Sequence, residues 1–204
     1  MDTFKALMKE IKHCRECQSV FEHDVVPIVW GHQNAKIMQI SQAPSLKVHQ
    51  IGRPFSDQSG KKLREWYQID ETTFYNQDNF YITSLAHCYP GKSQYGGDKK
   101  PPHICYEKWL FKEMDSVHNQ IYIIIGSYAA KVFFPDQTLD DLVFNDQMIH
   151  GKRTFVLPHP SPLNRGWIKK HLDFQDRMKE ISRVVQTYCD ISKIENEEEN
   201  HDRK

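Results

Sequence analysis

The chain has 204 residues, of which 39% are hydrophobic and 12% aromatic, and its 27 basic and 27 acidic side chains give a formal net charge of zero. This length suits one substantial hydrophobic core, and the neutral balance argues against a strongly basic nucleic-acid-binding protein. No stretch approaches the roughly 18 apolar residues of a membrane span, and the start lacks a secretory signal, so we expect a cytoplasmic protein without membrane contact.

Helical segments and short apolar strands alternate along the chain. We expect helices over residues 4–11, 59–67, 102–114, 128–134 and 174–188, and strands over residues 35–40, 80–85, 120–125 and 154–157. This alternation indicates a parallel sheet covered on both faces, because each right-handed crossover places a helix on one face. The predicted fold class is α/β, a three-layer αβα sandwich with a central four-stranded parallel sheet. Residues 1–190 are predicted to form one domain, and residues 191–204 a disordered acidic tail.

Polar and proline-rich loops follow three of the predicted strands. Residues 41–45 (SQAPS) follow the first strand, Ser84 lies at the end of the second, and residues 157–164 (LPHPSPLN) leave the fourth. Three prolines restrict this last loop, so it loses little entropy when it presents His159 to a ligand. Ligands of parallel sheets bind beyond the carboxyl ends of the strands. The sequence therefore predicts a site where these three loops converge.

Four of the five cysteines form a candidate metal site. Cys14 and Cys17 form a CxxC pair, whereas Cys88 and Cys105 lie much further along the chain. In a cytoplasmic protein such cysteines are better metal ligands than disulfide partners. Four thiolates suit either a structural zinc ion or an iron-sulfur cluster, and the ligand type alone does not choose between them. Cys189 is left over, and we expect it in the core or on the surface.

Basic side chains gather around the proline-rich loop. Residues 152–183 contain eight basic and three acidic side chains, a balance that suits a phosphate backbone. A solvated helix face explains the same charges nearly as well. The glycine-rich, basic loop over residues 91–100 is a second, weaker candidate for phosphate contact.

These motifs together resemble the signature of the uracil-DNA glycosylase superfamily. The resemblance rests on residues 41–45, on Gly52-Arg53-Pro54-Phe55 and on residues 157–164, and it covers roughly residues 14–174. The cysteine positions resemble the iron-sulfur branch of that superfamily. This branch implies a 4Fe-4S cluster held by Cys14, Cys17, Cys88 and Cys105, with structural zinc as the alternative.

The resemblance also implies an activity and a set of site residues. The protein would be a monomeric, monofunctional DNA glycosylase that hydrolyses the N-glycosidic bond of uracil or another deaminated base in DNA, leaving an abasic site for base excision repair. His159 would donate to the base carbonyl, and Phe55 would stack on the base. The other implied base contacts are Ala43, Pro44 and Ser84. The implied DNA contacts are Ser161, Leu163, Asn164, Arg165, Lys169 and Lys170, with Leu163 as the intercalating wedge.

Two positions depart from the branch pattern. Gln42 stands where the branch carries glutamate, and it can orient a water molecule but cannot accept its proton. Ser84 stands where the branch carries the asparagine that reads uracil, and its reach is shorter. These departures motivate a second hypothesis, a non-catalytic module that binds damaged or single-stranded DNA. A third hypothesis, a redox or metal sensor, leaves the proline-rich loop unexplained.

Overall fold

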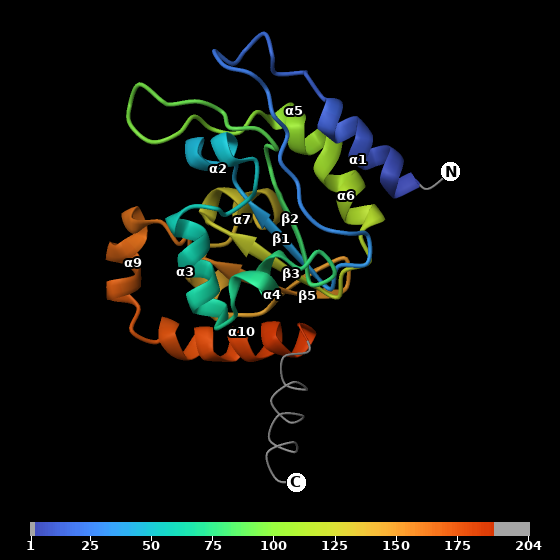
Figure 1. The fold of residues 1–204 in the computed structure, drawn as a ribbon. Helices are drawn as coiled ribbons and strands as arrows, with labels where there is room; N and C mark the ends of the chain where they lie inside the picture. Colours follow the sequence, from blue (N-terminus) through green and yellow to red (C-terminus); the bar gives the residue numbers. More distant parts are fainter. Residues whose placement is uncertain (1–2, 190–204) are drawn as a thin grey trace.

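The computed structural model describes residues 3–189, so the predicted acidic tail lies outside the described residues (Figure 1). Its centre is one five-stranded sheet with the strand order β2-β1-β3-β5-β4. The strands in that order are β2 (Phe80–Ser84), β1 (Ile37–Ser41), β3 (Ile121–Ile125), β5 (Lys152–Leu157) and β4 (Gln147–Ile149). The first four run parallel, and β4 pairs antiparallel with β5.

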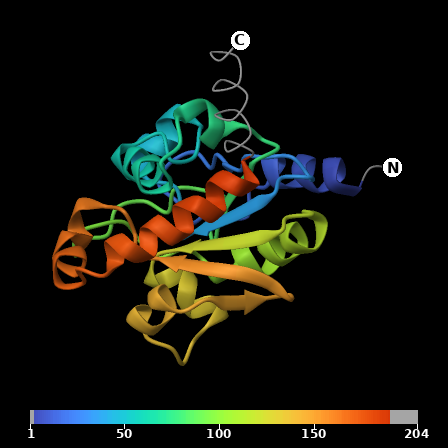
Figure 2. The same cartoon turned by 90° about the horizontal axis from the view of Figure 1, so that it is seen from below.

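Helices cover both faces of this sheet (Figure 2). The helices are α1 (Thr3–His13), α2 (Leu46–Ile51), α3 (Gln58–Tyr67), α4 (Glu71–Tyr75), α5 (His103–Cys105), α6 (Phe111–Ser116), α7 (Ser127–Phe133), α8 (Leu139–Phe144), α9 (Arg165–Lys170) and α10 (Phe174–Tyr188). A π-helical turn, η1 (Tyr106–Leu110), joins α5 to α6, and a 3-10 turn, η2 (Pro162–Asn164), precedes α9. Helices α3 and α10 pack together on one face, and α1 packs on α6. None of the helices within residues 3–189 has the length and apolar character needed to cross a bilayer.

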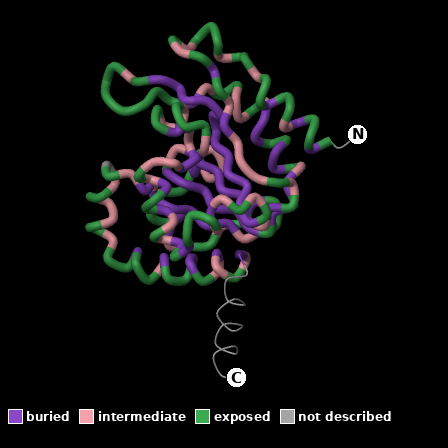
Figure 3. The backbone as a smooth tube through the Cα atoms, in the orientation of Figure 1, coloured by how far each residue is buried: buried purple, intermediate pink, exposed green. Residues whose placement is uncertain are grey.

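The predicted α/β class and its four parallel strands are confirmed. Every residue of β1, β2 and β3 is buried (Figure 3), as expected for strands covered on both faces. The structure adds β4, a three-residue edge strand that the sequence analysis did not predict. It reaches β5 through a tight turn in which His150 and Gly151 have φ values of 49° and 72°. Two residues of β4 are not buried, so its sequence lacks the apolar run from which a strand could be predicted.

The register of the sheet brings the predicted loops to one edge. Ser41 at the end of β1 pairs with Ser84 at the end of β2, and Ile125 at the end of β3 pairs with Leu157 at the end of β5. Backbone hydrogen bonds then continue past the strands, from Leu85 N to Ser41 O at 2.9 Å and from Ala86 N to Gln42 O at 3.1 Å. The loops after β1 and β2 are therefore fixed to each other before they reach solvent.

Candidate functional site

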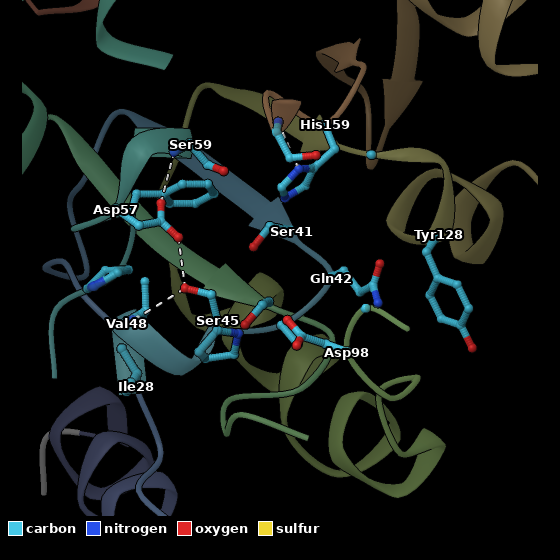
Figure 4. Close-up of a pocket in the computed structure, with 18 of the residues that line it drawn as sticks. Ile28, Ser41, Gln42, Ser45, Val48, Asp57, Ser59, Asp98, Tyr128 and His159 are labelled. Atoms are coloured by element: carbon cyan, nitrogen blue, oxygen red, sulfur yellow. Dashed lines mark hydrogen bonds between the residues drawn. The ribbon is translucent and has the colours of Figure 1, made fainter. Parts of the chain in front are cut away.

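A cavity of about 480 Å³ opens at this carboxyl edge, within the size range of small-molecule sites (Figure 4). The loops after β1, β2, β3 and β5 contribute to its wall, together with the segment that leads into α3. The predicted site residues that line it are Gln42, Ala43, Pro44, Phe55, Ser84, His159, Ser161 and Asn164. Loops that are far apart in the sequence thus line one cavity. Their positions after parallel strands predicted this convergence.

His159 enters this cavity as a hydrogen-bond donor with a fixed orientation. The backbone N–H of Ser161 donates to Nδ1 at 3.2 Å, which makes Nδ1 an acceptor and leaves the proton of the neutral ring on Nε2. Burial lowers the pKa of His159, and the Asp57 carboxylate opposes this effect only in part. The Asn164 side chain donates to the His159 carbonyl oxygen at 2.8 Å and braces the loop. The site therefore holds a neutral imidazole with one N–H group free to meet an acceptor.

Phe55 supplies an aromatic wall from a strained turn. It is 8% exposed, and its ring packs edge-to-face on Phe74 with centroids 6.3 Å apart. Its φ of 52° lies in the left-handed region, which a phenylalanine adopts only when its surroundings enforce it. Gly60 permits this turn, because a Cβ atom on any other residue at position 60 would lie 1.7 Å from the Phe55 carbonyl oxygen. The first turn of α3 thus fits under Phe55 only with glycine at position 60.

The two residues that depart from the branch pattern lie on neighbouring loops of the wall. Gln42 and Ser84 both line the cavity, and the backbone bond from Ala86 N to Gln42 O holds their loops together. The Ser84 hydroxyl donates to the Ala86 carbonyl oxygen at 2.7 Å. Its proton is therefore engaged within its own turn, and only its oxygen can accept from a base.

Asp57 is a residue of this wall that the sequence analysis missed. Its Oδ1 atom caps α3 by accepting the backbone N–H groups of Ser59 and Gly60 at 3.1 and 3.2 Å. Its Oδ2 atom accepts the Ser45 hydroxyl at 2.7 Å. The available signal was an acidic residue two positions after the predicted stacking residue and directly before a helix. That pattern is also an ordinary helix cap, so sequence alone gave no reason to choose a site role.

The four predicted metal-binding cysteines come together from distant segments. Cys14, Cys17, Cys88 and Cys105 line a second cavity beside Trp109. Burial raises the pKa of the Cys17 and Cys88 thiols, and their cysteine neighbours raise it further. Within residues 3–189, no group of three or more histidine, cysteine or acidic side chains is already arranged to hold a metal ion. The donor set fits a centre with four thiolate ligands.

Comparison with known proteins adds independent evidence. The sequence profile of the family described as "Uracil DNA glycosylase superfamily" matches residues 28–182, about three quarters of the chain. This chain belongs to the uracil-DNA glycosylase superfamily. It is 26% identical over 147 residues to the Type-4 uracil-DNA glycosylase of Archaeoglobus fulgidus, covering 71% of this chain and 68% of that protein. The solution NMR structure of a candidate uracil DNA glycosylase from Methanosarcina acetivorans matches with a TM-score of 0.46 and 16% identity, covering 78% of this chain and 94% of that one.

The residues predicted to contact DNA in this superfamily member divide into two groups. Ser161 and Asn164 line the cavity, whereas Arg165, Lys169 and Lys170 are exposed on the short helix α9 that follows. The structure does not describe the side chain of Leu163. Contact of these residues with DNA stays a prediction, and the cationic side chains of α9 are accessible for it.

A buried charged network lies beside the cysteines. His87 Nδ1 lies 3.3 Å from the Cys105 sulfur, and His87 Nε2 lies 2.9 Å from a carboxylate oxygen of Glu113. Burial lowers the pKa of His87, but Glu113 and Cys105 outweigh this effect and raise it to about 10. Thr83 and Tyr81 donate further hydrogen bonds to the same carboxylate. A protonated His87 therefore lies between the Cys105 sulfur and the Glu113 carboxylate and can donate to both.

Proposed function

We propose that this chain is a DNA glycosylase that hydrolyses the N-glycosidic bond of uracil or another deaminated base and leaves an abasic site. The observation that carries the proposal is the neutral His159 imidazole, whose Nδ1 atom accepts from Ser161 and whose N–H group enters the cavity that Phe55 lines. A nucleobase flipped out of the DNA stack has the two features that this cavity addresses, a flat face and polar carbonyl edges.

The chemistry follows from where charge develops in the reaction. As the glycosidic bond breaks, its electron pair leaves with the base, and negative charge grows on the base carbonyl oxygen. A donor fixed at that oxygen stabilises the transition state more than the ground state. His159 supplies this donor, and Phe55 supplies a stacking surface that any base can use. Lys92 also lines the cavity, but its ammonium group forms an ion pair with Asp98 at 2.8 Å. An amine held in this way is a poor nucleophile toward the sugar, which supports hydrolysis by water over attack by lysine.

Base release from defined oligonucleotides tests this function. We expect the full-length, metal-loaded protein to convert a uracil-containing oligonucleotide to an alkali-labile product and to leave the strand intact without alkali. Matched single- and double-stranded substrates carrying uracil, hypoxanthine or xanthine would identify the preferred base and form. A protein that binds these oligonucleotides but releases no base would contradict the glycosylase function and support the non-catalytic alternative.

We also propose that Cys14, Cys17, Cys88 and Cys105 hold a 4Fe-4S cluster, with structural zinc as the alternative. The support is the meeting of four thiols at one cavity and the His87 hydrogen bond to Cys105. When bound, such a cluster would link the segment after α1 to the loop after β2. Its contribution is then structural, because the cavity lined by the four cysteines (the cysteine cavity) and the cavity lined by His159 and Phe55 (the base cavity) share no lining residue.

Replacing single cysteines should remove the metal centre. We expect Cys17→Ser and Cys105→Ser to lose bound iron, acid-labile sulfide and visible absorption, because each removes one of four thiolate ligands. Cys189→Ala is the matched control, since Cys189 is buried in the main core and does not line the cysteine cavity. Metal analysis of the purified proteins provides the measurement. Stoichiometric zinc without iron would contradict the cluster, and full metal content in Cys17→Ser would contradict the ligand assignment.

A further inference from the structure

The base cavity contains the carboxylate of Asp57, which takes no part in the roles proposed for His159 and Phe55. Its Oδ1 atom serves as the cap of α3, and its Oδ2 atom accepts one hydrogen bond, from Ser45. A carboxylate oxygen can accept more than one donor, so Oδ2 has capacity for another. Asp57 is half-buried and lines the cavity wall (Figure 4). A water molecule in the cavity can therefore reach a charged acceptor that is already held in place.

A general base speeds hydrolysis, and Gln42 cannot act as one. Attack by water is assisted when a nearby group takes its proton, and a neutral amide does not. The carboxylates that line the cavity are those of Asp57 and Asp98. Lys92 binds Asp98 at 2.8 Å and offsets its charge. The donors that hold Asp57 are a hydroxyl and two backbone amides, which leave its negative charge in place.

The position of Asp57 relative to the other site residues suits this role. Asp57 lies close enough to His159 for its charge to act on the imidazole, and the two side chains stand on different sides of the cavity with Ser41 between them in Figure 4. Asp57 also follows Phe55 by two residues. Phe55, His159 and Asp57 line one cavity, so a base held between the first two lies in a space that Asp57 also lines. The other ionisable side chains in this lining are Lys92, Asp98 and Tyr128.

We propose that Asp57 is the carboxylate that accepts the proton of the attacking water, a role that rests on the proposed glycosylase function. In this step the bond between the sugar C1′ and the base nitrogen breaks, and its electron pair leaves with the base. The water oxygen forms the new bond to C1′, one water proton moves to Asp57 Oδ2, and solvent later takes that proton. The same negative charge faces a sugar that becomes positive in the transition state, so it also favours the reaction electrostatically.

Two substitutions separate this role from helix capping. Asp57→Asn and Asp57→Ser both keep an oxygen that can cap α3, and both remove the carboxylate. We expect each to lower the single-turnover rate of uracil release by about a hundredfold or more, the lower end of general-base effects. Binding to an oligonucleotide with 2′-fluoro-2′-deoxyuridine, which resists cleavage, should stay within a few-fold of wild type. Added formate should raise the rate of Asp57→Ser, because it can occupy the vacated carboxylate position, and should leave the wild-type rate unchanged.

The control is another helix cap outside the cavity. Asp70 caps α4 by accepting the Thr73 N–H at 2.7 Å, so Asp70→Asn reproduces the change in cap chemistry and should keep the wild-type rate. A wild-type rate in either Asp57 variant would overturn the proposal for Asp57 and leave the glycosylase function standing. A wild-type protein that releases no base from any deaminated substrate would overturn both.

Discussion

His159→Ala should lower the single-turnover rate of base release by about a hundredfold or more, the effect of removing one fixed donor from a developing oxyanion. The donor matters most in the transition state, so binding to an uncleavable 2′-fluoro oligonucleotide should change far less than the rate. Quenched-flow or manual sampling with excess enzyme, together with a binding titration, measures the two quantities separately. A loss confined to binding would contradict the assigned role.

A surface histidine provides the matched control for this prediction. His32 forms an exposed pair with Asp78 at 2.9 Å and does not line the cavity. His32→Ala should therefore release base at the wild-type rate. His159→Gln adds a graded test, because its amide can donate a hydrogen bond but is not held by the Ser161 N–H in the same way. We expect its rate to lie between those of His159→Ala and wild type.

Gly60→Ala should disable the site without removing any side chain that contacts a base. The added Cβ would lie 1.7 Å from the Phe55 carbonyl oxygen and 2.6 Å from its carbonyl carbon, so the backbone of Phe55 must move. We expect a loss of about 1–3 kcal/mol in the free energy of unfolding, typical of overpacking, and a large fall in base release. Denaturant titration and single-turnover kinetics measure the two effects. Wild-type values of both would show that the turn at Phe55 adapts freely.

Gly166→Ala is the corresponding control. Gly166 lies in α9, its φ is not in the left-handed region, and a Cβ there would meet nothing within 4 Å. Because alanine favours helix more than glycine does, this variant should be as stable as wild type or slightly more so. Comparing the two alanines separates the steric contact at Phe55 from a general effect of replacing glycine.

The sequence predicted the parts of the fold whose patterns are strong over several residues. The four parallel strands are rich in apolar residues, and α10 places Phe174, Met178, Ile181 and Val185 on one buried face. The sequence analysis missed α2, α4, α8, α9 and β4, which have six residues or fewer. Segments this short complete too few turns or alternations to show a period, so their structure depends on tertiary contacts.

The site residues that belong to a recognisable loop motif could be predicted from the sequence. His159, Phe55, Gln42 and Ser84 follow from the motifs and the parallel sheet, and all four line one cavity. Asp57 was not predictable in the same way, because its two carboxylate oxygens have different surroundings. One oxygen serves a local helix cap, and the other meets Ser45, 12 residues away in the chain. Only the folded chain shows that Asp57 lines the cavity.

The short stretch after β2 connects the two cavities mechanically. Ser84 and Ala86 are bonded to each other and to the loop of Gln42, while His87, the next residue, donates its backbone N–H toward the Cys105 sulfur at 3.4 Å. Four consecutive residues thus span the distance from the nucleobase wall to the thiols. If the proposed metal centre were lost or its cysteines oxidised, this stretch would lose its anchor beside the thiols, and we expect the cavity wall at Ser84 to be held less firmly.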